Sequence, residues 1–120
     1  YREPVISLDI YATMSELAGA TIPRNKPLDG VNLLPYLNAT QPGVPHEALF
    51  WRSMEKSAFR AGDWKAVRNP HRGKNGDWEL YNLRADIGEQ DNLKSQYPDR
   101  LEKLIDGWKK MNEEMIDPLW

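Results

Sequence analysis

With a period of two, the side chains of residues 78–83 (WELYNL) divide into two sets that point in opposite directions: Trp78, Leu80 and Asn82 in one, and Glu79, Tyr81 and Leu83 in the other. That period, in a run rich in aromatic and large apolar residues, predicts a β-strand. The residues that follow it are polar and include Asp86, Gly88 and Asp91, three common turn formers. We therefore expect the strand to end at Leu83 and a loop to begin there.

Three shorter runs that precede this strand have the same character. The first, Ala48–Ser53 (ALFWRS), is rich in aromatic residues. The other two, Ser57–Ala61 and Trp64–Arg68, are separated only by Gly62 and Asp63, a two-residue connection that favours a primed hairpin turn. Short strands joined by tight turns predict an antiparallel meander of three or four strands.

The C-terminal part of the chain has a helical period, and we predict a helix over Pro98–Met115. Proline suits the first helical position. Gly107 costs the helix about 1 kcal/mol relative to alanine, so we expect it to mark a close contact. An apolar stripe of this kind must be buried, and the predicted sheet is the obvious partner. The stripe consists of Leu101, Leu104, Ile105, Trp108, Met111 and Met115.

The N-terminal part is predicted to be helical and loop-like. A helix is expected over Ser7–Gly19, capped by Ser7 or Asp9, with an apolar face formed by Ile10, Met14, Leu17 and Ala18. A single helical turn is expected over Leu33–Leu37, with Asn32 as its cap. The predicted fold class is therefore α+β: a small antiparallel sheet packed by a long C-terminal amphipathic helix and preceded by an N-terminal helix. We treat residues 1–120 as one subdomain, with 1–46 as a helical and loop connection and 47–120 as the sheet and its helix.

Composition narrows the function classes. The 120 residues are 40% hydrophobic and 28% charged, which is typical of a globular chain. The net charge of −2 gives no electrostatic reason to expect nucleic acid or an anionic membrane as a partner. Zero cysteines exclude disulfides, thiolate metal sites and a cysteine nucleophile within these residues. The chain opens with Tyr1 and has no hydrophobic leader, so we expect a fragment of a longer protein.

Candidate chemistry is sparse. His46 and His71 both lie in predicted loops, and neither has a second histidine or a carboxylate at metal-ligand spacing on one element. Each histidine has two possible roles. It either acts on a substrate, as a contact or a general acid, or it is a solvated loop side chain, which is the commoner role. Asp86 and Asp91 do not follow the order of a calcium loop, and we expect them to accept backbone N–H groups in the turn.

Two basic segments are candidates for contact with an anion. Residues 69–76 (NPHRGKNG) contain Arg72 and are either a contact to an anionic substrate such as a sulfated sugar or a solvated hairpin tip. No phosphate-binding loop pattern is present. Trp51 stands beside Arg52, and an aromatic residue next to an arginine is a common sugar or anion contact. Trp64, Trp78 and Trp108 have core-facing periods, and we interpret them as packing residues.

The residues 78–93 (WELYNLRADIGEQDNL) resemble the ELYDLxxDPxExxNL pattern near the C-terminus of sulfatases. Three other segments are similar to sulfatase motifs in the same order: residues 8–19 to the D-[IL]-x-P-T…LAG helix, residues 28–37 (LDGVNLLPYL) to LDGxSLLPLL, and residues 59–65 (FRAGDWK) to RxGDWK. Ala12 and Ile87 replace two prolines of these patterns. The chain is similar to the C-terminal region of sulfatases of the arylsulfatase or N-acetylgalactosamine-6-sulfatase type, within the alkaline-phosphatase-like superfamily.

The resemblance implies a parent enzyme that hydrolyses sulfate esters with a formylglycine residue and a calcium ion held by carboxylates. The formylglycine is made within a C/S-x-P-x-R motif, which this chain lacks, and the family's metal ligands lie upstream of the matching region. No catalytic residue, metal ligand or cofactor is therefore assigned to this segment, which by itself is expected to be inactive.

The role implied for the segment is to support the catalytic domain and to line the substrate cleft. The residues expected at that rim are His46, Trp51, Arg52, His71 and Arg72. The implied partners are the parent catalytic domain and a sulfated carbohydrate, with no nucleic acid or membrane, in a periplasmic, extracellular or lysosomal location. The alternative is a stand-alone carbohydrate-binding or structural module derived from a sulfatase tail.

Overall fold

The structure is a computed structural model that describes residues 1–22, 25, 28–71 and 76–116. The chain forms two compact units, residues 1–47 and 48–120. No helix within the described ranges is long and apolar enough to cross a membrane.

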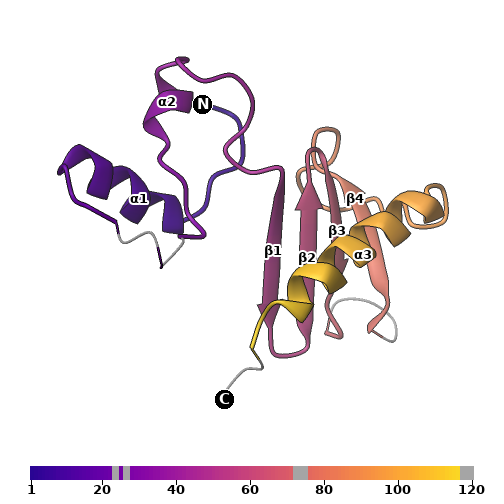
Figure 1. Cartoon of the computed structure of the whole chain (residues 1–120). Coiled ribbons are helices and arrows are strands. Elements are labelled where there is room, and N and C mark those ends of the chain that lie inside the picture. Colours follow the sequence, from indigo (N-terminus) through magenta and orange to yellow (C-terminus); the bar gives the residue numbers. More distant parts are fainter. Residues whose placement is uncertain (23–24, 26–27, 72–75, 117–120) are drawn as a thin grey trace. The chain divides into compact units, whose positions relative to one another are not determined.

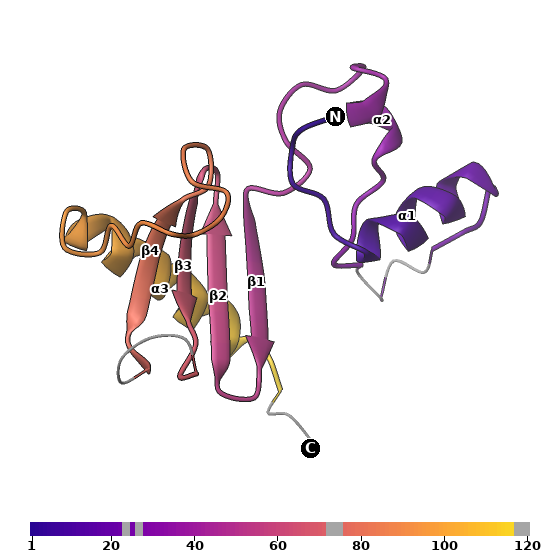
Figure 2. The same ribbon diagram turned by 180° about the vertical axis from the view of Figure 1, so that it is seen from behind.

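The second unit is a four-stranded sheet covered by one helix, which confirms the predicted α+β class. The strands lie in the order β1-β2-β3-β4, and every neighbouring pair is antiparallel. The helix α3 (Pro98–Glu113) runs obliquely across one face of this meander (Figures 1 and 2). The strands are β1 (Ala48–Ser53), β2 (Lys56–Ala61), β3 (Trp64–Arg68) and β4 (Trp78–Asn82).

The core of this unit lies between the sheet and α3. One row of cross-strand partners joins Phe59 to Ala66 and Ala66 to Leu80, so the three side chains share one face of the sheet. Leu104 of α3 packs against them, and Ala66 and Leu80 are fully buried. Burial of this apolar surface, worth about 25 cal/mol per Å², holds the helix to the sheet.

Trp108 packs against this core, as the apolar stripe predicted. Its ring stacks on Phe50 with centroids 5.6 Å apart and meets Trp78 edge-on at 5.7 Å. The preceding residue, Gly107, lies directly over Phe59, and a Cβ atom there would be 2.7 Å from the phenyl ring. The prediction that Gly107 marks a close contact is confirmed.

The connections follow the predicted turn chemistry. Gly62 has φ of +57°, which suits the first central position of a primed hairpin turn between β2 and β3. After β4, the Asp86 carboxylate accepts the backbone N–H groups of Gln90 at 2.7 Å and Asp91 at 2.9 Å, and so fixes the loop. The predicted strand end at Leu83 and helix end at Met115 are each slightly late, since β4 ends at Asn82 and α3 at Glu113.

The first unit contains α1 (Leu8–Leu17) and the single turn α2 (Leu34–Leu37). The apolar residues predicted to form one face of α1 are largely exposed: Ile10 by 63%, Met14 by 58% and Leu17 by 61%. The side of α1 that is buried carries Ala12, Ser15 and the carboxylate of Asp9 instead. Among the residues of this unit that the structure describes, none covers the apolar face of α1.

Candidate functional site

Two arginines meet at the end of the sheet that carries the β1–β2 turn. Arg52 of β1 and Arg68 of β3 both pair with Ser57 of β2, so the pleat directs all three to the face covered by α3. Both arginines line a cavity of about 400 Å³, together with Trp108. Two guanidinium groups and one carboxylate, that of Glu55, line this cavity, so its side chains carry a net positive charge that favours an anion.

Contacts within the chain hold each guanidinium group in place. Arg52 donates through one terminal nitrogen to the Asn112 side-chain oxygen at 2.7 Å and through the other to the backbone carbonyl of Ile116. Arg68 donates through Nε to the carbonyl of Gly76 at 3.0 Å. A guanidinium has five N–H donors, so these bonds orient each group without using its full donor capacity.

His71 lies at the same end of the sheet. It lines a neighbouring cavity of about 340 Å³ that shares Met54 and Glu55 with the cavity of Arg52. Its backbone N–H donates to the Asn69 side chain at 3.1 Å, which shapes the start of the loop after β3. Arg52 and His71 therefore line two adjacent cavities at this end of the sheet, and Arg72 lies outside the described residues.

Trp51 points to the other face of the sheet. Strand alternation separates its side chain from that of Arg52, and 44% of Trp51 is exposed. The ammonium group of Lys65 lies 5.9 Å from its ring, within reach of a cation–π interaction. Lys65 also forms a 2.5 Å ion pair with Glu89 of the loop after β4.

His46 belongs to the first unit, where it binds a buried carboxylate. Its Nε2 atom lies 2.9 Å from both oxygens of Asp9. The same carboxylate accepts the backbone N–H of Ile6 at 2.8 Å and that of Val31 at 2.9 Å. Asp9 is fully buried, and these four contacts tie α1 to the segments on either side of it.

The pKa of Asp9 reflects two opposing effects. Burial raises it, but the hydrogen bonds from the backbone of Ile6 and Val31 and the interaction with His46 together hold the pKa below its ordinary value. The sequence suggested Asp9 only as a cap for its own helix. A carboxylate placed on the buried side of α1, next to small residues rather than large apolar ones, is the signal that could have identified this network.

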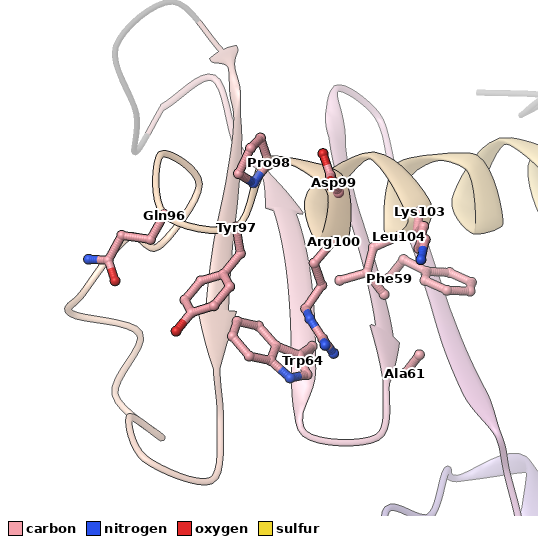
Figure 3. Close-up of a pocket in the computed structure, with 10 residues that line it drawn as sticks. All are labelled: Phe59, Ala61, Trp64, Gln96, Tyr97, Pro98, Asp99, Arg100, Lys103 and Leu104. Atoms are coloured by element: carbon pink, nitrogen blue, oxygen red, sulfur yellow. The ribbon is translucent and has the colours of Figure 1, made fainter.

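A third cavity, of about 530 Å³, lies between the start of α3 and the β2–β3 hairpin (Figure 3). Trp64 forms part of its wall, although its period in the sequence suggested packing alone. The Trp64 ring meets Tyr97 edge-on with centroids 5.1 Å apart, and Arg100 lies over it. Nothing in the local sequence marks this cavity, because its residues come from β2, β3, α3 and the loop that precedes α3.

Among the described residues, no three histidine, cysteine, aspartate or glutamate side chains lie close enough together to hold a metal ion.

The chain is similar in sequence and in structure to known sulfatases. The chain is 33% identical to an uncharacterised sulfatase of Schizosaccharomyces pombe over 88% of its own length, and 30% identical to a sulfatase of Formosa agariphila over 94%. The chain spans about a fifth of the length of these curated relatives, 21% and 22%. The crystal structure of Ps i-CgsB in complex with k-i-k-neocarrahexaose superimposes on 98% of the chain with a TM-score of 0.79 and 27% identity. No family model matches the chain.

This chain has the sequence and the fold of the C-terminal region of sulfatases.

The motifs shared with sulfatases have structural roles in this C-terminal region. In the segment 28–37 (LDGVNLLPYL), a Cβ atom at Gly30 would lie 2.3 Å from the carbonyl oxygen of Leu8, so only glycine fits beside the start of α1. In the NL motif, the Asn92 side-chain oxygen accepts the N–H of Leu80 at 3.2 Å, and the N–H of Leu93 donates to the carbonyl of Leu80 at 2.8 Å. The sulfatase motifs in this region therefore hold the fold together.

Proposed function

We propose that this chain is the C-terminal subdomain of an enzyme that hydrolyses sulfate esters of carbohydrates. The observation that carries the proposal is the extent of the match: two sulfatases align with 88% and 94% of this chain, which is only about a fifth of either relative. The oligosaccharide bound by Ps i-CgsB supports a carbohydrate substrate. The resemblance to sulfatases also makes a periplasmic, extracellular or lysosomal location part of the proposal.

The exposed apolar face of α1 is evidence that this chain packs against a catalytic domain. Ile10, Met14 and Leu17 lie on one side of that helix and are each more than half exposed. Leaving three large side chains in water forgoes about 1.5–3 kcal/mol for each of them. A much larger catalytic domain that covers this face would recover that free energy, whereas a stand-alone binding module would leave it exposed.

The end of the sheet at the β1–β2 turn is the proposed substrate rim. Arg52 and His71 line adjacent cavities there, and the guanidinium of Arg52 retains N–H donors beyond those used by Asn112 and Ile116. The side chains of Arg52 and His71 are suited to bind the charged group of a sugar substrate. Arg72 remains part of this proposal through its place in the sequence next to His71. Trp51, whose side chain lies on the other face of the sheet, and His46, which binds Asp9 in the first unit, remain separate candidates and are not part of this rim.

The test is to measure sulfate release by the complete protein of which this chain is a part. The purified protein is incubated with 4-nitrophenyl sulfate and with a panel of sulfated oligosaccharides, and free sulfate is measured by ion chromatography. Release of sulfate from a sulfated oligosaccharide is the expected result. Binding of the oligosaccharides without sulfate release from any substrate would contradict the proposal and favour the carbohydrate-binding module.

A further inference from the structure

The cavity at the start of α3 presents two positively charged side chains. Arg100 and Lys103 stand one turn apart on the helix and both line the cavity (Figure 3). The guanidinium carbon of Arg100 lies 4.6 Å from the centre of the Trp64 ring, a stacked position that holds the planar group in place. Within the described part of the chain, neither Arg100 nor Lys103 forms an ion pair or a hydrogen bond.

The local field favours a negative charge in this cavity. Asp99 is the only acidic residue among its lining residues, and Figure 3 shows its carboxylate on the far side of the helix start from the guanidinium of Arg100. The start of α3 adds a partial positive charge, because Tyr97 makes no side-chain cap bond to the first turn. Two cations and a helix start thus oppose a single carboxylate.

The rest of the cavity is shaped for a ring with polar substituents. Trp64 and Tyr97 form an aromatic corner, and Phe59 and Leu104 supply an apolar floor. The amide of Gln96 stands at the edge of the cavity, where it can donate to or accept from hydroxyl groups (Figure 3). The volume of about 530 Å³ falls within the range of small-molecule sites.

We infer that this cavity binds one anionic pyranose unit of a saccharide chain. Its sulfate or carboxylate group lies against Arg100 and Lys103, and the C–H face of its ring lies against Trp64 and Tyr97. The inference rests on the proposed function for the class of substrate. It goes beyond that function because it assigns recognition of a sugar unit to the opposite end of the sheet from Arg52 and Arg68.

The test is to titrate the complete protein with three hexasaccharides in a calorimeter. Hexagalacturonate carries carboxylates and no sulfate ester, so it is bound without turnover. A carrageenan hexasaccharide carries sulfate esters, and an agarose hexasaccharide is a neutral galactan of the same length. We expect the anionic hexasaccharides to bind and the neutral one to bind at least tenfold more weakly, and the stronger of the two anionic ligands identifies the charged group.

The double variant carries both Arg100→Ala and Lys103→Ala. The control variant is Lys110→Ala, which removes an exposed lysine further along the same helix. The double variant is expected to lower the affinity for the anionic ligands by about tenfold or more, and the control to leave it unchanged. Arg100→Lys keeps the charge but loses the planar stack, so an intermediate affinity is expected. Equal affinity of wild type and double variant for both anionic ligands would overturn the inference, as would equal binding of the neutral hexasaccharide.

Failure of this inference is distinguishable from failure of the proposed function. Hydrolysis of 4-nitrophenyl sulfate needs no saccharide binding, so the double variant should keep the wild-type kcat and KM for that ester. For a sulfated polysaccharide it should raise KM with kcat unchanged. If the protein binds the anionic hexasaccharides through Arg100 but releases no sulfate, the inference about this cavity is supported and the proposed sulfatase function is contradicted.

Discussion

The Nε2 atom of His46 lies 2.9 Å from both carboxylate oxygens of Asp9, a residue 37 positions earlier in the chain. This pair closes the first unit on itself, because the same carboxylate also holds the backbone at Ile6 and Val31. His46 is expected at the substrate rim from the sequence, and in the structure its side chain is 9% exposed and engaged with Asp9.

Asp9→Ala should destabilise the first unit by roughly 3 kcal/mol. The substitution leaves the N–H groups of Ile6 and Val31 and the ring of His46 without their acceptor in a buried place. Hydrogen exchange of the complete protein checks this, with faster exchange expected in peptides that cover residues 5–10 and 29–34. Asp29→Ala, at an exposed carboxylate of the same unit, is the control and should leave that exchange unchanged.

The stability contributed by Asp9 should depend on pH in a defined direction. Its pKa is lowered in the folded chain, so the unfolded chain binds the proton more tightly. The contribution is therefore complete above the ordinary aspartate pKa of about 4 and is lost as the pH falls through and below that value. Urea unfolding of the complete protein from pH 3 to 7 should show a steeper acid loss for wild type than for Asp9→Asn. Parallel curves would contradict the assignment.

Gly107→Ala should destabilise the sheet and helix unit by about 1 kcal/mol. Alanine gains about 1 kcal/mol in helix propensity, but its Cβ atom would lie 2.7 Å from the buried ring of Phe59, and overpacking of this kind costs about 1–3 kcal/mol. Denaturant unfolding followed by tryptophan fluorescence measures the change. In a Phe59→Leu background the same substitution should become neutral or stabilising, and a penalty that persists there would show that the contact is not the cause.

Arg52→Ala in the complete protein should raise KM for a sulfated oligosaccharide by about tenfold if Arg52 binds the substrate's charge. The variant also removes the bonds to Asn112 and Ile116, so thermal unfolding is measured alongside the kinetics. Arg52→Lys keeps the charge, so its KM should fall between the values for wild type and Arg52→Ala. Arg84→Ala removes a largely exposed arginine and serves as the control. Unchanged kinetics for both Arg52→Ala and Arg72→Ala would show that the rim hypothesis is wrong.

Much of the second unit could be predicted from short patterns. The strand β1 and the strand β3 begin and end where their periods predict, and Gly62 turns the chain between β2 and β3 as its position suggests. These features depend on residues a few positions apart, so local alternation and turn chemistry suffice to predict them. The rim residues could be proposed from their chemistry, but their grouping could not.

The sequence by itself determined the α+β class, the bounds of β1 and β3 and the resemblance to sulfatases. Only the tertiary structure decided that Asp9 meets His46, that Arg52 meets Asn112 across 60 positions, and that Arg100 of α3 stacks on Trp64 of β3. Contacts of this kind depend on the register of the sheet and on how the helix crosses it. Those are set by packing of the whole unit, and the identity of neighbouring residues in the chain carries little information about them.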